Sequence, residues 1–152
     1  MKIAAFNVQK LGLDKLNNHV VRTNLIKIVS RYSVVVLLEV MGQGGKVMYE
    51  FLTELNNDRK NRHQPFKMKC SRSLGRRSYK EKFVFFYRKD ELKVIKCYQY
   101  KEGKKDVLAR EPFILWFKSP NTVVKDFVLI PVHTKPKDAE KELDALDDVV
   151  KM

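Results

Sequence analysis

Residues 34–38 read Val-Val-Val-Leu-Leu, a run of five apolar residues of which three are β-branched. Such a run predicts a strand that is buried on both faces. Before it, Ile3–Val8 predicts a first strand, and Lys15–Arg31 carries apolar residues along one helical face. After it, a glycine-rich stretch ends the strand and Val47–Leu55 predicts a second amphipathic helix. The chain therefore begins with the order strand, helix, strand, helix.

The second half of the chain changes to short strands separated by charged turns, a pattern typical of antiparallel pairing. The predicted strands are Phe66–Ser71, Phe83–Arg88, Leu92–Tyr98, Pro112–Lys118 and Phe127–His133. A final helix is expected over Asp138–Lys151, whose apolar residues share one face. We interpret residues 1–152 as one α/β domain, a mixed and mostly antiparallel sheet with flanking helices.

One apolar face of this predicted sheet has no covering layer, because the helices do not suffice for both faces. At about 25 cal/mol per Å², leaving about 1,000 Å² of apolar area uncovered forfeits roughly 25 kcal/mol. That exceeds the net stability of a typical domain. We therefore expect the chain to be stable only with a second chain or a second copy of this chain covering the open sheet face, or with a rearranged packing.

The composition favours an anionic partner. The 152 residues include 31 Lys+Arg and 18 Asp+Glu, which gives a net charge of +13. A basic surface concentrates polyanions such as nucleic acid, although charge alone fits a merely soluble basic protein equally well. No apolar run is long enough to predict a membrane span, and the polar start Met1–Asn7 is not a secretion signal. Cys70 and Cys97 lack metal-ligand spacing, and we expect free, half-buried thiols.

Polar side chains at the ends of predicted strands are candidate site residues. Asn7 lies at the end of the first strand and Glu39 at the end of the second. Open α/β sheets bind ligands at strand ends, and amide and carboxylate oxygens are suitable ligands for Mg²⁺ or Ca²⁺. His133 follows a buried apolar run, where an imidazole can act as general base or acid. Taken alone, a solvated carboxylate and a hydrogen-bonded structural histidine are the ordinary alternatives.

The tract Gly75–Lys82 (GRRSYKEK) is a fourth candidate. It combines guanidinium groups for phosphate, an aromatic ring for sugar or base contacts, and a carboxylate, Glu81, that is able to orient an imidazole. The alternative interpretation is a charged turn before a strand.

Five motifs follow one another along the chain. They are KIAAFNV (2–8), LLEV (37–40), LGRRSYKE (74–81), REP (110–112) and IPVHT (130–134). In order and spacing they resemble the deoxyribonuclease I-like family of the endonuclease/exonuclease/phosphatase superfamily, over essentially the whole chain. The resemblance implies a four-layer αββα sandwich and metal-dependent hydrolysis of DNA, with Mg²⁺ and/or Ca²⁺ as cofactor. It also implies an extracellular or secretory location.

The resemblance implies roles for individual residues. Glu39 and Asn7 would serve the metal, with Asn7 also touching the metal-bound phosphate of the DNA. His133 would be one of two catalytic histidines, with Glu81 as its orienting carboxylate.

Three further residues would contact DNA. The resemblance implies that Arg110 lies near the scissile phosphate. It places Tyr79 and Arg77 against the minor groove and the backbone.

The chain also departs from the family pattern. The family's Gly-Asp-Phe-Asn and Ser-Asp-His motifs have no counterpart here, so we interpret residues 1–152 as a partial domain that lacks the carboxy-terminal half. Met41 stands where the family usually has a basic or polar residue, and Tyr100–Arg110 lacks the pancreatic enzyme's disulfide loop. Because the parts of a catalytic unit act together, we expect this truncated chain alone to be an impaired or inactive endonuclease. The alternatives are a catalytically silent basic nucleic-acid-binding fragment and a phosphoesterase acting on phosphoinositides or sphingomyelin.

Overall fold

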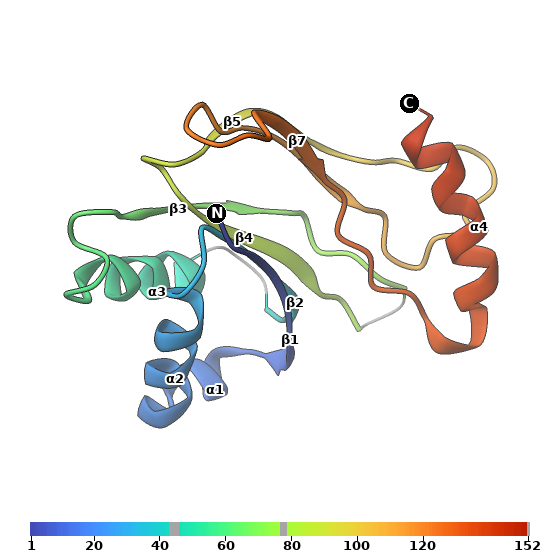
Figure 1. Cartoon of the computed structure of the whole chain (residues 1–152). Coiled ribbons are helices and arrows are strands. Elements are labelled where there is room, and N and C mark those ends of the chain that lie inside the picture. The colour runs from blue at the N-terminus through green and yellow to red at the C-terminus, as the bar shows by residue number, and fades with distance from the viewer. Residues whose placement is uncertain (43–45, 77–78, 152) are drawn as a thin grey trace.

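The computed structural model describes residues 1–42, 46–76 and 79–151 (Figure 1). Its elements are β1 (Ile3–Leu11), α1 (Leu13–Asn17), α2 (His19–Val29), β2 (Val34–Val40), α3 (Lys46–Asn57), β3 (Phe66–Cys70), β4 (Lys82–Arg88), β5 (Lys93–Gln99), β6 (Phe113–Lys118), β7 (Asp126–Leu129), the 3-10 turn η1 (Pro136–Asp138) and α4 (Ala139–Val150). The α/β class and the mostly antiparallel strand pairing predicted from the sequence are confirmed.

The first sheet has the strand order β1-β2-β4-β3, with β1 and β2 parallel and the other pairs antiparallel. Helices α1, α2 and α3 cover one of its faces (Figure 1). The single helix predicted over Lys15–Arg31 is wrong, because Asn18 divides it into α1 and α2. The Asn18 side-chain oxygen accepts hydrogen bonds from the backbone amides of Val20 and Val21, which caps the start of α2.

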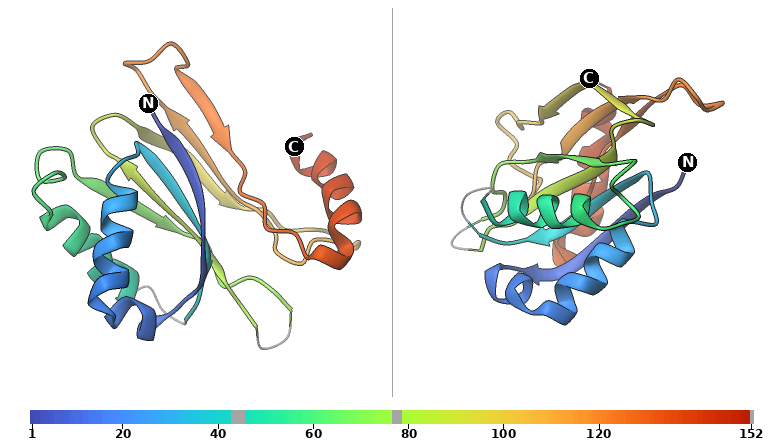
Figure 2. Two further views of the ribbon diagram at one scale, coloured as in Figure 1. Left: turned by 60° about the horizontal axis from the view of Figure 1, so that its bottom comes forward. Right: turned by 90° about the vertical axis from the view of Figure 1, so that its left-hand side faces the viewer.

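The other face of the first sheet is covered by a second sheet, β5-β6-β7, from the same chain (Figure 2). The expected bare face is therefore wrong. Phe85 of β4 is fully buried between the sheets, with ring centroids 6.1 Å from Phe113 and 6.3 Å from Phe117. The alternation along β6 explains this packing, since Phe113, Leu115 and Phe117 point inward while Trp116 points outward.

The outer face of the second sheet is only partly covered, by α4. Val149 of α4 packs with Leu108 and Ile114, whereas Trp116 and Val128 stay exposed. The chain thus supplies the layer order helix, sheet, sheet, helix of an αββα sandwich. Within the described residues, the helices are too short or too polar to span a membrane.

The last predicted strand is shorter than expected. β7 ends at Leu129 instead of reaching His133, because Pro131 cannot donate a ladder hydrogen bond. His133 therefore lies in a loop between β7 and α4, which leaves its side chain free to turn toward the first sheet.

The two cysteines differ in exposure. Both are free, but Cys70 is half-buried whereas Cys97 is exposed, so the prediction of two half-buried thiols holds only for Cys70. Burial raises the pKa of the Cys70 thiol, an effect that nearby Lys82 opposes.

This difference predicts selective alkylation. At about pH 8, near the ordinary thiol pKa, iodoacetamide is expected to modify Cys97 well before Cys70, because only the thiolate reacts. Peptide mass spectrometry after timed quenching measures both rates, and raising the pH should narrow the gap. The control is the alkylation rate of Cys70 in a Cys97→Ser variant. If it equals the rate in the native chain, modification of Cys97 does not affect Cys70. Faster labelling of Cys70 would contradict the structure.

Candidate functional site

Three segments that are distant in sequence bring titratable side chains together. Glu39 comes from the end of β2, Glu81 lies just before β4, and His133 lies in the loop after β7. Ligand atoms of all three lie within 4.8 Å of one another. His133 Nδ1 is 2.5 Å from Glu81 Oε1, and His133 Nε2 is 3.6 Å from Glu39 Oε1. The imidazole therefore has one carboxylate at each ring nitrogen.

A distorted backbone aims Glu39 at this cluster. Glu39 has a φ of 62°, in the left-handed region that non-glycine residues rarely occupy. The β2–β4 register shifts between Leu37 and Val40, and Gln9 and Lys10 in the neighbouring strand β1 also have positive φ. Such bulges re-aim side chains and often lie beside active sites.

Strand β1 holds the Glu39 carboxylate from the other side. Asn7 was expected at the end of the first strand, but β1 continues past it to Leu11. The backbone amide of Lys10 donates to Glu39 Oε2 at 3.1 Å, and the Asn7 side-chain amide donates to Glu39 Oε1 at the same distance. The Asn7 oxygen accepts from the backbone amide of Gln9 at 2.8 Å. Asn7 thus contacts Glu39 through its NH₂ group.

Glu81 is the buried centre of the site, with 2% of its surface exposed. Its Oε1 also lies 2.7 Å from Arg110 Nε, an ion pair whose alignment is not that of a hydrogen bond. Arg110 Nη1 donates to the backbone oxygen of His133 at 3.1 Å. Glu81 Oε2 is buried and has no hydrogen-bond partner among the described residues. A buried carboxylate oxygen left without a donor is costly unless another positive group approaches it.

The donor set suits a divalent cation. Two carboxylates offer hard oxygen ligands, and Glu81 Oε2, which has no donor among the described residues, is an acceptor that a cation would satisfy. The imidazole of His133 is an additional ligand type for such ions. Mg²⁺ commonly keeps several waters and uses one or two carboxylates, so Glu39 and Glu81 together fit it.

Tyr79 lies beside the cluster, while Arg77 is outside the described residues. Burial raises the pKa of Tyr79, and the negative charges of Glu39 and Glu81 raise it further against an opposing effect of Arg110. Lys10 Nζ stands 5.3 Å from the centre of the Tyr79 ring, a cation–π arrangement. The structure therefore places Asn7, Glu39, Tyr79, Glu81, Arg110 and His133 around one position.

Gly75 shapes the tract that carries Tyr79. Its φ is +126°, and a Cβ at this position would stand 2.6 Å from the backbone oxygen of Tyr79. Only glycine accepts both conditions without a backbone shift.

We expect Gly75→Ala to destabilise the fold by about 1–3 kcal/mol, the usual cost of such backbone strain, and to displace Tyr79. Urea denaturation measures the free energy of unfolding. Gly103→Ala is the matched control, because a Cβ at Gly103 meets nothing within 4 Å. Equal stability of the two variants would show that the Gly75 backbone is not constrained as described.

Two residues at the site were not predicted from the sequence. The backbone amide of Lys10 holds Glu39, and nothing in a lysine's side chain signals such a role. Glu142 of α4 is buried at the back of the site. Its position in phase with Leu146 and Val149 on the apolar face of the helix was a signal that it is buried.

Comparison with known proteins supports the resemblance. Deoxyribonuclease-1-like 1 of Cricetulus griseus is 43% identical over 148 residues, which cover 97% of this chain and 48% of that protein. Deoxyribonuclease-1 of Mus musculus is 38% identical over 153 residues, 98% of this chain and 53% of that protein. The chain spans about half the length of these curated relatives. No protein-family profile matches it.

A solved endonuclease/exonuclease/phosphatase from Bacteroides vulgatus shares the fold. It superposes with a TM-score of 0.59 at 17% identity, covering 99% of this chain and 59% of that structure. The predicted fold class and the resemblance to deoxyribonuclease I-like proteins are both confirmed.

Proposed function

We propose, on the premise that this chain is a deoxyribonuclease I-like sequence, that it carries one half of a nuclease site for metal-dependent phosphodiester hydrolysis in DNA. The observation that supports this proposal most directly is that Glu39, Glu81 and His133 come together from three separate segments. The relatives that match along the chain are named as deoxyribonucleases. Because the chain spans about half their length, its domain is proposed to be partial and its activity alone impaired.

Glu39 and Asn7 remain the proposed holders of Mg²⁺ and/or Ca²⁺, and Asn7 also keeps Glu39 in place. Glu81 is added to them because its carboxylate lies in the same cluster as Glu39. When bound, the cation would offset the negative charge that develops on the phosphate. Glu81 accepts from Nδ1 of His133, which fixes the ring and leaves Nε2 as the position where a proton is taken up or released. The catalytic pair in this proposal is therefore His133 with Glu81 as its orienting group.

DNA is the proposed substrate. Arg110 stands next to His133, where its guanidinium can face a phosphate, and Tyr79 with Lys10 extends the polar surface beyond Glu39. Arg77, two residues before Tyr79, is proposed as a further DNA contact from its place in the sequence. The net charge of +13 supports a polyanionic substrate.

The second candidate is a silent nucleic-acid-binding fragment. The observation that favours it is the same charge of +13 together with a site that contains one histidine. Binding of this kind needs no divalent cation. It weakens as the salt concentration rises, because the release of counterions from DNA then contributes less free energy.

Supercoiled plasmid distinguishes the two functions. The purified chain is incubated with plasmid in Mg²⁺ plus Ca²⁺, in EDTA, and in increasing salt. Conversion to the nicked form that disappears in EDTA supports the nuclease. Plasmid retardation without nicking, which persists in EDTA and fades with salt, supports the binding fragment and contradicts the nuclease as a property of this chain alone.

A second chain, or a second copy of this chain, is also proposed, but at a different surface from the one expected. The strands β1 and β7 are edges of the two sheets and lie on the same side of the sandwich (Figure 2). Ile3 and Phe6 of β1 and Val128 of β7 are exposed, and an unpaired apolar edge is a template for another strand. A monodisperse monomer with one cooperative melting transition in light scattering and calorimetry would count against this partner. An extracellular or secretory location is proposed from the resemblance alone.

A further inference from the structure

Glu142 is a buried carboxylate behind the site. It lies in the first turn of α4 with 1% of its surface exposed. Its Oε1 accepts from the backbone amide of Ala109 at 2.8 Å, and its Oε2 accepts from the backbone amide of Lys135 at 2.6 Å. Each carboxylate oxygen thus accepts a hydrogen bond from a different loop. Among the described residues, no basic side chain forms a salt bridge with it.

The two amides adjoin the two groups that surround Glu81. Ala109 precedes Arg110, and Lys135 follows His133 by two positions. Arg110 and His133 touch each other through Arg110 Nη1 and the His133 backbone oxygen, and both touch Glu81 Oε1. The contacts therefore close a ring that runs from Glu142 through both loops to Glu81.

The cost of burial argues that these bonds matter. A carboxylate removed from water is strongly disfavoured unless hydrogen bonds compensate it. Charge-assisted bonds to backbone amides are short and strong, and they fix two backbone positions against one rigid helix. A glutamate on the exposed face of the helix would stay hydrated and would not need such hydrogen bonds.

The loop that carries Arg110 has its own internal bonds. Glu111 accepts from the backbone amide of Glu102 at 3.0 Å and pairs with Arg72 at 2.6 Å. Glu102 in turn accepts from the backbone amide of Leu108 at 2.7 Å. Loss of the Glu142 carboxylate should therefore shift this loop against the His133 segment without unravelling it.

We propose that Glu142 is a positioning residue that sets Arg110 and His133 around Glu81. That Glu142 holds the two loops follows from the contacts above. That this affects DNA binding rests on the proposed function.

Glu142→Gln tests whether Glu142 holds the two loops. The substitution keeps the shape but replaces one acceptor oxygen by an NH₂ group, which faces one of the two amides. We expect amide hydrogen exchange to rise about tenfold or more at Ala109 or Lys135, relative to core amides such as Phe85 that report global stability. Glu140→Gln, an exposed change of the same chemistry on the same helix turn, should leave both amides unchanged. A rise that is uniform across the chain, or none, overturns the proposal.

Glu142→Asp provides the same readout if the glutamine variant does not fold. The shorter carboxylate keeps the charge but cannot reach both loops, so selective loss of protection at one of the two amides is expected. Protection at both equal to that of the native chain overturns the proposal.

A double-mutant cycle on DNA affinity tests the consequence. With a short duplex and fluorescence anisotropy, Glu142→Gln should weaken binding about tenfold in the native background and hardly at all when Arg110 is already alanine. Additive losses overturn positioning of Arg110. If the native chain binds no duplex, the proposed function fails, while the exchange result still decides whether Glu142 holds the two loops.

Discussion

Replacing His133 by alanine is expected to lower the rate of metal-dependent plasmid nicking by about 10²- to 10⁴-fold, the usual contribution of a general acid–base group. The reason is geometric. His133 is the only histidine placed against Glu39 and Glu81 in the described part of the chain. Its Nδ1 is held by Glu81, so the substitution removes the imidazole that is proposed to transfer the proton. Agarose gels of plasmid conversion over time give the rate.

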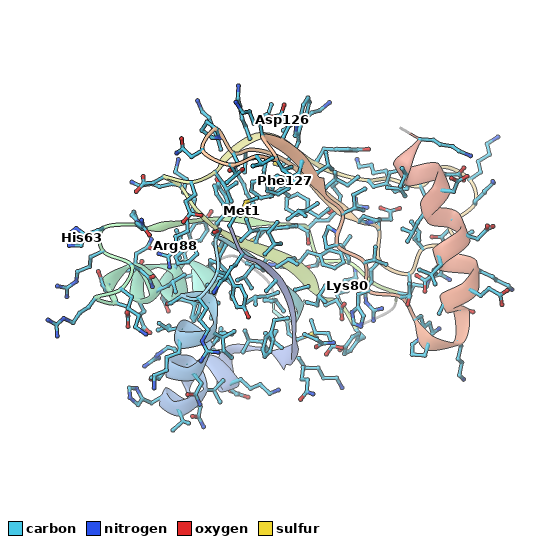
Figure 3. All side chains as sticks on the ribbon, in the orientation of Figure 1. Met1, His63, Lys80, Arg88, Asp126 and Phe127 are labelled. Carbon is cyan, nitrogen blue, oxygen red and sulfur yellow. The ribbon has the colours of Figure 1, made fainter. Side chains whose placement is uncertain are left out.

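His63→Ala is the control for that variant. His63 is exposed at the end of the molecule away from Lys80 and the site (Figure 3). The His63→Ala variant should nick plasmid at the same rate as the native chain. This should hold for the chain alone and for the chain together with any partner that restores its activity. Equal rates for the His133 variant and the native chain would remove His133 from the mechanism.

Replacing Phe85 by alanine is expected to cost about 3–5 kcal/mol of folding free energy. Phe85 is fully buried and packs between the rings of Phe113 and Phe117, so its removal opens a cavity where the two sheets meet. Since domains are commonly stable by about 5–15 kcal/mol, this one change should remove a large part of the total. Urea denaturation followed by circular dichroism measures the loss.

Phe6→Ala is the matched control. Phe6 lies on the edge strand β1 with 40% of its surface exposed, so the same truncation should cost much less. Similar losses at the two positions would mean that the sheets do not pack face to face as described.

Local patterns predicted the elements well but not their assignment to sheets. The run at 34–38 became β2, and the short second-half strands formed close to their expected positions. Periodicity reports which residues are buried but not which sheet buries them. β4 and β5 are therefore adjacent in sequence yet belong to different sheets, a choice that depends on contacts between distant residues. The expectation of an uncovered face was wrong for this reason.

The site was predictable to the extent that short motifs carry it. The predicted strand ends pointed to Asn7 and Glu39, although β1 continues past Asn7 to Leu11, and the family resemblance paired His133 with Glu81. The left-handed backbone at Glu39 could not be predicted, because nothing in a glutamate favours that conformation. The burial of Glu142 could be predicted from its position on the apolar face of the helix. Its two backbone partners could not be predicted, because only tertiary folding brings them to it.

Paramagnetic broadening by Mn²⁺ tests the central claim most directly, because it needs neither turnover nor DNA. The chain has three histidines, and His19 and His63 are exposed and serve as internal references. Substoichiometric Mn²⁺ is expected to broaden the imidazole signals of His133 first, and Glu39→Gln should abolish that selectivity. Broadening of all three histidines together, or of His19 or His63 before His133, would contradict a cation site at Glu39 and Glu81 beside His133.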